Sequence, residues 1–296
     1  MTLMLLDGAS LWFRAFFGVP SSVVAPDGSP INAARGFLDH VSRLVTEHRP
    51  TDLVCCLDHD WRPQFRVDAV PSYKTHRVVE DSETDTPDEL APQVAVILEV
   101  LDAVGICAVG SDGYEADDVI GTLATRADAD VLVVTGDRDL FQLIGPRTRV
   151  VYTVTKDAVL DDAYVQRKYG LPSAATYADF ALLRGDPSDG LPGVPGVGEK
   201  TAAAMITKYG SVAGLLAALD AGEDVTGGAK VAAARAYVEA AGPVVLVAHD
   251  CPLPDLATRL PSTPRDPDRL VEIADRYGLR SSASRLVQAL TAATSE

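Results

Sequence analysis

The stretch ICAVGSDGYEADDVIGTLATRADADVLVVTGDRD (residues 106–139) decides the fold, because two apolar runs in it are separated by a helical segment. Residues 106–109 and 130–135 are predicted strands, and the helix between them starts near Glu115 and runs to about Ala127. A strand, a helix of this length and a second strand imply a right-handed crossover between parallel strands. We therefore expect an α/β protein with a mainly parallel central sheet and helices on both faces.

The same alternation recurs in the first half of the chain and then stops. Three further strands and two further helices are predicted at residues 2–6, 52–57, 149–154, 32–48 and 90–104. From residue 161 on, only helices and turns are predicted. We expect an α/β core over residues 1–172 and a helical region over residues 173–296.

Composition indicates a globular cytoplasmic protein. The chain has 296 residues, of which 47% are hydrophobic, and no run approaches the roughly 18 apolar residues of a membrane span. Its amino terminus lacks the basic region and the cleavage site of a signal peptide. Four cysteines without a CxxC pair suit reduced thiols in a core.

The formal net charge of -16 argues at first sight against a nucleic-acid partner, because binding to phosphates usually requires a basic surface. Acidic residues gathered at one site can, however, leave a basic surface elsewhere. Residues 61–77 form such a segment, in which basic and aromatic side chains alternate: Trp61, Arg62, Phe65, Arg66, Tyr73, Lys74, His76 and Arg77. Nucleic acid therefore remains a candidate partner.

Carboxylates follow the predicted strands at the points where the strands end. Seven acidic residues do so: Asp7, Asp58, Glu115, Asp117, Asp118, Asp137 and Asp139. The carboxyl ends of parallel strands meet at one edge of a sheet, where ligands of such folds bind. Glu115 to Asp118 alone could be an ordinary helix start, since acids are favoured in a first turn. Convergence from several strands favours a cation site instead.

A second acidic group precedes a glycine-rich turn in the helical half. Asp186 and Asp189 are three residues apart, so in a helical turn they would share a face. The run from Gly190 to Gly198 then enters a helix at about Thr201. Exposed backbone amides at a helix amino terminus suit a phosphate, and carbonyls of the same turn could hold a monovalent cation.

Oxygen ligands without histidine or thiolate select magnesium or manganese rather than zinc. Two such ions about 3.5 to 4 Å apart can activate water and neutralise charge in phosphodiester hydrolysis. Lys74 and Arg77 would project from one helix face towards a phosphate, and Tyr73 could stack on a base. Nine carboxylates are more than one octahedral ion needs.

These motifs resemble the 5′-nuclease or flap endonuclease family, most closely the bacterial 5′-3′ exonuclease domains that begin many DNA polymerase I chains. The resemblance spans essentially the whole chain, which here would stand alone. The matching motifs are Leu6-Asp7-Gly8, Phe65-Arg66, Tyr73-Lys74 with Arg77, residues 113–118, residues 135–139 and residues 185–201. Two positions differ from the family pattern: Gly190 replaces a usual Asn, and Leu57 replaces a frequent aromatic residue.

The resemblance implies a PIN-like or resolvase-like core, a helical arch over about residues 62–100, and a helix-three-turn-helix element at about residues 182–212. It implies roles for the following residues: metal ligands Asp7, Asp58, Glu115, Asp117, Asp118, Asp137, Asp139, Asp186 and Asp189; catalytic Tyr73, Lys74 and Arg77; DNA-binding Arg66, Gly193, Gly196, Gly198, Lys200 and Thr201; and a potassium loop at Gly193, Val194, Gly196 and Gly198.

The function that the resemblance implies is that of a structure-specific 5′-3′ exonuclease and flap endonuclease in replication and repair. It would hydrolyse the phosphodiesters of 5′ flaps or RNA primers with two or more Mg²⁺ or Mn²⁺ ions and one K⁺. Its partner would be branched or flapped duplex DNA, or an RNA-DNA hybrid, bound by a monomer. Two alternatives stay open: a non-catalytic binder of DNA junctions or flaps, and an aspartate-dependent phosphatase suggested by Asp58-His-Asp60.

Overall fold

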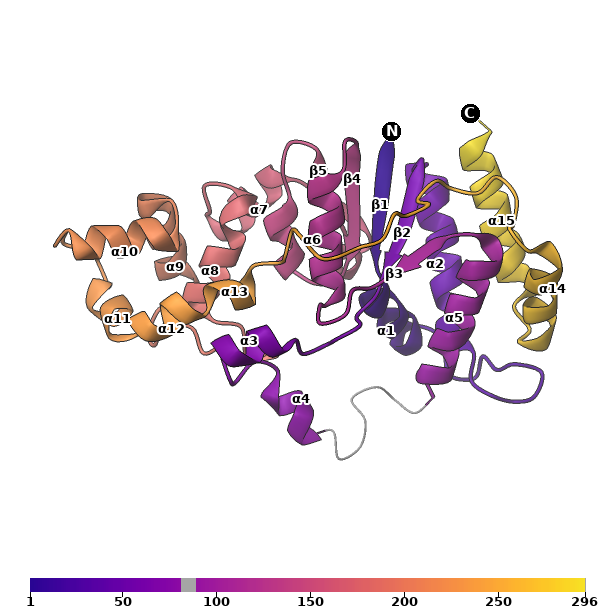
Figure 1. Cartoon of the computed structure of the whole chain (residues 1–296), viewed down its shortest axis with the longest axis horizontal. Helices are drawn as coiled ribbons and strands as arrows, with labels where there is room; N and C mark the ends of the chain where they lie inside the picture. The colour runs from indigo at the N-terminus through magenta and orange to yellow at the C-terminus, as the bar shows by residue number, and fades with distance from the viewer. Residues whose placement is uncertain (81–88, 296) are drawn as a thin grey trace.

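One six-stranded sheet forms the centre of the molecule, in the order β3-β2-β1-β4-β5-β6 (Figure 1). The computed structural model describes residues 1–80 and 89–295. The strands are β1 (Thr2–Asp7), β2 (Asp52–Cys56), β3 (Cys107–Val109), β4 (Asp130–Thr135), β5 (Thr148–Tyr152) and β6 (Ala158–Leu160). All neighbours are parallel except β5 and β6. The predicted mainly parallel sheet is confirmed, whereas β6 was missed because three residues show no periodicity.

The strand order reverses between β1 and β4. The chain builds outwards from β1 to β2 and β3, and then returns to add β4 and β5 on the other side of β1. In sheets of this kind a crevice opens beyond the carboxyl ends of the two strands at the reversal. The fold therefore places a binding site next to the ends of β1 and β4.

Helices cover both faces of the sheet, as predicted. Successive side chains of β1 point to opposite faces, so that Leu3 and Leu5 enter one apolar core and Met4 and Leu6 enter the other. The helices of the first core include α6 (Ala116–Arg126), η1 (Asp139–Leu143), α7 (Asp162–Tyr169) and η3 (Ala174–Thr176). Those of the second include α1 (Gly8–Gly18), α2 (Asn32–His48) and α5 (Ala91–Val104).

A group of helices extends the first core away from the sheet and lies at the left of Figure 1. It consists of α8 (Tyr177–Arg184), η4 (Pro187–Asp189), α9 (Glu199–Tyr209), α10 (Val212–Asp220), α11 (Gly228–Ala233), α12 (Arg235–Ala240) and α13 (Gly242–Val245). Helices α8 and α9 flank the glycine-rich turn, which confirms the predicted helix–turn–helix arrangement.

The last two helices correct the expected extent of the helical region. Helix α14 (Pro267–Arg276) packs on α5, and α15 (Arg280–Thr294) packs on α2. Both belong to the second core, at the opposite end of the molecule from α10 (Figure 1). The predicted region of residues 173–296 is therefore too long, because its last part covers the sheet.

The expected arch over residues 62–100 is also corrected at one end. Helices α3 (Gln64–Ala69) and α4 (Thr75–Glu80) lie below the sheet in Figure 1, but α5 packs on α2 as part of the core. The predicted polar stretch of residues 80–88 lies almost wholly outside the described residues. Lys74 precedes α4 with φ 48°, so the expectation that Lys74 and Arg77 share one helix face is wrong.

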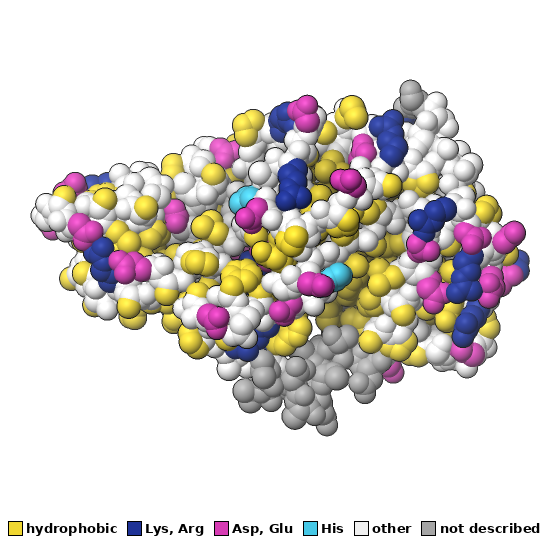
Figure 2. All heavy atoms as spheres, viewed as in Figure 1, with side chains coloured by type: hydrophobic (Ala, Val, Ile, Leu, Met, Phe, Trp, Pro, Cys, Tyr) yellow, Lys and Arg dark blue, Asp and Glu magenta, His cyan; other side chains and the backbone are white. Residues whose placement is uncertain are grey.

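Acidic and basic side chains alternate at the α14 end of the molecule (Figure 2). There Arg269 lies 2.6 Å from Glu99 and 2.9 Å from Glu272.

All four cysteines are free thiols, and three of them are buried, which confirms their predicted place in the core. Among the described helices none is by itself long and apolar enough to cross a membrane, although α9 and α10, bent by 74°, meet those criteria as a pair.

Candidate active site

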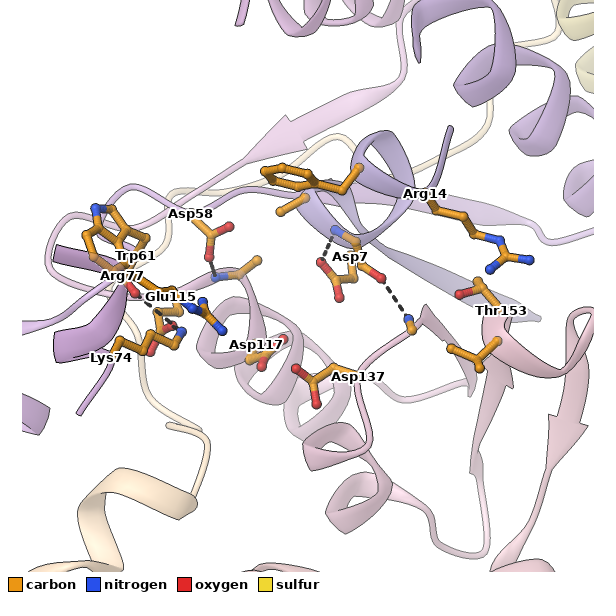
Figure 3. A pocket seen from close by; sticks show the side chains of 16 residues that line it. Asp7, Arg14, Asp58, Trp61, Lys74, Arg77, Glu115, Asp117, Asp137 and Thr153 are labelled. Carbon is orange, nitrogen blue, oxygen red and sulfur yellow. Dashed lines mark hydrogen bonds and ion pairs between the residues drawn. The ribbon is translucent and has the colours of Figure 1, made fainter. Parts of the chain in front are cut away.

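A cavity of about 600 Å³ opens where the strand order reverses (Figure 3). Five of its lining residues are predicted metal ligands: Asp7, Asp58, Glu115, Asp117 and Asp137. They come from the ends of β1 and β4, from the segment after β2, and from the start of α6. Lys74 and Arg77 also line the cavity. The predicted convergence of strand-end carboxylates is therefore observed for these five residues.

Asp7 is held in a fixed orientation by two donors. It caps α1, where one carboxylate oxygen accepts a hydrogen bond from the Ser10 backbone N–H at 3.1 Å. The other oxygen accepts from the Thr135 hydroxyl at 2.6 Å. Thr135 Oγ1 in turn accepts from the Asp137 backbone N–H at 2.8 Å. The two strands at the reversal are thus joined through Thr135, between two cavity carboxylates.

Asp58 joins β2 to the helix that carries two further acids. Its side chain accepts a hydrogen bond from the backbone N–H of Ala116, in the first turn of α6, at 2.8 Å. Glu115 is the residue before that helix, and Asp117 lies in its first turn. The positive end of the helix dipole therefore faces the acidic cavity and favours ionised carboxylates there.

Ionisation of the acids in the cavity is nevertheless unfavourable, as their raised pKa values indicate. Burial, with the charges of Asp58 and Asp137, raises the pKa of Asp7 to about 7. Burial, followed by the charges of Asp137 and Asp7, raises the pKa of Asp117 well above its usual value. These acids ionise readily only with added positive charge nearby. Their all-oxygen donor set therefore fits a hard divalent cation.

The described side chains do not form a closed coordination shell. In residues 1–80 and 89–295, no three Asp, Glu, His or Cys side chains lie close enough together to hold one metal ion. Magnesium commonly keeps several waters and uses only one or two protein carboxylates. A cavity of about 600 Å³ lined by separated carboxylates suits such hydrated ions.

Asp118 and Arg66 have structural roles instead of the predicted ones. Asp118 is fully buried and absent from the cavity lining. One of its oxygens accepts from Arg66 and from the Ala248 backbone N–H, and the other accepts from Arg66 and from the Glu115 backbone N–H. Arg66 is 3% exposed and cannot reach DNA. The predictions of Asp118 as a metal ligand and Arg66 as a DNA contact are corrected, because each satisfies the other.

The prediction that Tyr73 stacks on a base is also corrected. It is 3% exposed, and its hydroxyl donates to Glu115 at 2.7 Å, so its ring is not available to stack on a base. Lys74 does reach the cavity, where its ammonium pairs with Glu115 and lies 3.3 Å from the Trp61 backbone oxygen. Burial lowers the pKa of Lys74, but the carboxylates of Glu115 and Asp189 outweigh it and leave the pKa raised.

The second predicted group of acids adjoins the cavity without lining it. Burial raises the pKa of Asp139 well above its usual value, with further contributions from Asp137, Asp189 and Asp186. Asp186 pairs with Arg184 at 3.2 Å, and Asp189 pairs with Arg77 at 3.4 Å. The charges of Asp186 and Asp189 therefore contribute to the raised pKa of Asp139, although each of the two is itself paired with an arginine.

The glycine-rich turn leads directly into α9, and one of its carbonyl oxygens accepts a hydrogen bond from a lysine. Gly193 and Gly196 adopt φ values of 66° and 75°, and Gly198 caps α9. The Lys230 ammonium donates to the Gly196 carbonyl at 2.7 Å. The turn thus fits a monovalent positive charge, and the chain's own lysine supplies one. Lys200 is exposed on the first turn of α9 and Thr201 is partly exposed, both open to a ligand.

Several residues that line the cavity were not predicted. Ser10, Phe13 and Arg14 lie on α1, three, six and seven residues after Asp7, and share one face of that helix. Trp61, a member of the predicted basic and aromatic segment, also lines the cavity; it lies at the other end of the view from Arg14 (Figure 3) and is 40% exposed. Helical spacing from Asp7 would have identified the first three.

Comparison with known proteins identifies the family of the chain. Residues 2–170 match the family model described as 5′-3′ exonuclease, N-terminal resolvase-like domain, and residues 173–268 match 5′-3′ exonuclease, C-terminal SAM fold. A 5′-3′ exonuclease of Streptomyces coelicolor is 54% identical over 302 residues, which cover 98% of this chain and 100% of the relative. The chain belongs to the 5′-3′ exonuclease family.

Two further likenesses concern the polymerase relation and the fold. DNA polymerase I of Mycobacterium tuberculosis is 41% identical over 299 residues, which cover 99% of this chain and 32% of the polymerase. A structure of the bacteriophage T5 D15 flap endonuclease, in a pseudo-enzyme-product complex with DNA and metal ions, covers 98% of this chain with a TM-score of 0.66 and 17% identity, over 99% of its own length. The predicted family and its resolvase-like fold are confirmed. As a family member the chain is a nuclease, and the phosphatase alternative loses its support.

Proposed function

We propose that this exonuclease is a structure-specific 5′-nuclease that cuts 5′ flaps and primer ends on branched duplex DNA. The observation that carries the proposal is the single cavity in which five carboxylates from four chain segments face Lys74 and Arg77. Negative groups bind divalent cations and the basic pair attracts the phosphate, which is the division of labour that phosphodiester hydrolysis requires.

We infer that two or more Mg²⁺ or Mn²⁺ ions act here, held by Asp7, Asp58, Glu115, Asp117 and Asp137, with Asp139, Asp186 and Asp189 contributing to a second position. Support comes from the raised pKa values of Asp7 and Asp117, which an added cation would relieve. When bound, such ions lower the pKa of a water and neutralise phosphate charge. The relative from bacteriophage T5, which shares the fold, was crystallised with metal ions.

The chain's own residues orient the substrate. Lys74 and Arg77 enter the cavity beside Glu115, where both can donate to a phosphate oxygen. Lys74 pairs with Glu115 in this structure, and its ammonium would become available to the phosphate if Glu115 were held by a divalent ion. Phe13 and Trp61 offer aromatic faces in the same lining for the terminal bases.

The duplex is proposed to lie on the helical region. The glycine-rich turn, with Gly193, Val194, Gly196 and Gly198, would hold a monovalent cation against a backbone phosphate, and Lys200 and Thr201 would donate to the same strand. The Lys230 ammonium at the Gly196 carbonyl supports the site's preference for positive charge. All the proposed contacts come from one chain, so a monomer suffices. We place its action in the cytoplasm, in the replication and repair of DNA.

A 5′-labelled flap assay tests this function. The purified chain is incubated with flap DNA, a single-stranded control and a small phosphate ester in Mg²⁺ or Mn²⁺, and cleavage at the flap junction is expected. An RNA-tipped flap run in parallel tests the primer substrate. Tight flap binding without cleavage in either ion would instead support the non-catalytic junction binder, and hydrolysis of the ester alone would revive the phosphatase.

A further inference from the structure

Gly190 lies where the acidic turn meets the segment of residues 71–77 that carries Lys74. It ends the short helix η4 with φ 70° and ψ 20°. A Cβ atom at this position would lie 2.2 Å from the Ser72 backbone oxygen and 3.2 Å from the Lys74 backbone nitrogen. Both neighbours are backbone atoms, which cannot move aside by changing rotamer. In this chain any residue with a Cβ atom, including the Asn that is usual in the resembled family, would fit only if the two segments moved apart.

Polar contacts hold the two segments together on either side of Gly190. The Lys74 backbone N–H donates to the Asp189 carbonyl at 3.0 Å. Arg77 Nη2 donates to the Ser188 carbonyl at 3.1 Å and lies 3.4 Å from Asp189 Oδ1. The acidic turn is itself closed, because the backbones of Asp186 and Leu191 exchange hydrogen bonds of 2.8 and 3.0 Å. The acidic turn therefore holds segment 71–77 through several hydrogen bonds and is itself closed by hydrogen bonds.

The segment is fixed from its other side as well, in an uncommon conformation. Lys74 has φ 48°, a left-handed value that non-glycine residues adopt only when their surroundings hold them there. Arg62 Nε donates to the Tyr73 carbonyl at 2.6 Å. With its backbone held in this way, the Lys74 side chain enters the cavity beside Glu115.

We propose that Gly190 is a positioning residue that seats Lys74 and Arg77 over the cavity before substrate binds. It acts through the backbone of residues 71–77 and touches neither metal nor DNA. The proposal rests on the proposed function, in which Lys74 and Arg77 contact the phosphate. A larger residue at position 190 would push Ser72 and Lys74 away from the acidic turn. Misplacement by about 1 Å can cost about 10²-fold in rate.

Gly190→Asn and Gly170→Asn form a matched pair for the test. Gly170 ends α7 with φ 69° and ψ 26°, nearly the conformation of Gly190, but a Cβ atom there meets nothing within 4 Å. Both substitutions therefore carry the same left-handed backbone strain, and only the first adds a collision. Single-turnover flap cleavage with saturating enzyme should fall about 10²-fold in G190N and less than about twofold in G170N.

Flap-DNA affinity in EDTA should stay within about twofold of wild type in both variants, since the helical region is unchanged. Equal cleavage by G190N and G170N would overturn the proposal, and so would a G190N loss that lies wholly in affinity. The pair G190A and G170A repeats the comparison with one added methyl group, so a G190N chain that fails to fold does not end the test.

Trp61 gives a readout that does not depend on nuclease activity. Its backbone oxygen lies 3.3 Å from the Lys74 ammonium, and its ring is partly exposed in the cavity lining. Acrylamide quenching of tryptophan fluorescence in the metal-free chain should increase in G190N and not in G170N, because only G190N is expected to displace the Lys74 segment beside Trp61. The other tryptophan, Trp12, is buried and is common to both variants. Unchanged quenching in G190N would overturn the proposal even if flap cleavage failed for another reason.

Discussion

Arg66 and Asp118 form a two-point ion pair in the protein interior, with Arg66 Nη1 2.7 Å from Asp118 Oδ2 and Arg66 Nη2 2.6 Å from Asp118 Oδ1. The same guanidinium lies 2.6 Å from Glu115 and donates to the Val244 carbonyl at 3.2 Å. One buried arginine thus joins α3, the start of α6 and the end of α13. Through Glu115, it also fixes one wall of the cavity.

Replacing Arg66 with Met should lower the free energy of unfolding by about 3–5 kcal/mol, because Asp118 would remain buried without its counter-charge. Urea denaturation of the metal-free chain measures this loss. Arg147→Met is the control, since Arg147 pairs with Asp128 at 3.1 Å on the surface and should cost less than about 1 kcal/mol. Similar losses in both variants would contradict the buried-pair assignment. A large change in the salt dependence of DNA binding in R66M would restore Arg66 as a phosphate contact.

The raised pKa of Asp7, about 7, predicts a pH-dependent destabilisation that metal relieves. The unfolded chain has an Asp pKa of about 3.9, so the folded state holds the proton more tightly. The proton bound to Asp7 therefore stabilises the folded state. This stabilisation is complete below about pH 4 and is lost as the pH rises through about 7. In EDTA, Asp7→Asn should therefore raise Tm relative to wild type at pH 8 and change it little at pH 4.

Magnesium supplies the matching test on the wild-type chain. Its addition should raise Tm more at pH 8 than at pH 5, because the ion binds deprotonated carboxylates. Asp128→Asn, which changes an exposed surface carboxylate, should leave both effects intact. A metal-induced rise in Tm that is independent of pH would mean that Asp7 is already ionised in the metal-free protein.

The sequence sufficed for the positions that depend on the backbone alone. Strand ends determine where the following residues lie, so Asp7, Asp58 and Asp137 could be placed at one sheet edge from periodicity and topology. Likewise, the helix predicted over residues 90–104 does end at Val104, where Gly105 follows with φ 95°.

What sequence could not provide were partners far apart in the chain. Arg66 and Asp118 are 52 residues apart, and both types commonly face solvent or ligands, so periodicity could not pair them. The return of α14 and α15 to the sheet was missed for the same reason. An amphipathic face shows that a helix packs, but not on which surface.

Asp137→Asn combined with Asp139→Asn should reduce flap cleavage by more than about 10²-fold in Mg²⁺, the scale of losing one preorganised electrostatic contact in an active site. Flap binding in EDTA should persist. Asp128→Asn with Asp130→Asn is a control of equal charge, because Asp130 begins β4 at the opposite edge of the sheet and both residues are exposed. If the two double variants cleaved flaps equally, the cavity would not be the catalytic site.

Lys230→Met should make DNA binding more dependent on potassium. The Lys230 ammonium lies 2.7 Å from the Gly196 carbonyl, so wild type already carries a positive charge at the glycine-rich turn. Without it, K⁺ must supply the charge. The ratio of flap-DNA Kd in Na⁺ to that in K⁺, at equal ionic strength, should rise about tenfold in K230M, which corresponds to about 1.4 kcal/mol. Lys208→Met removes a charge over the Tyr209 ring, away from the turn, and should weaken binding equally in both salts. Identical salt profiles for K230M and K208M would show that Lys230 does not serve as the cation of this turn.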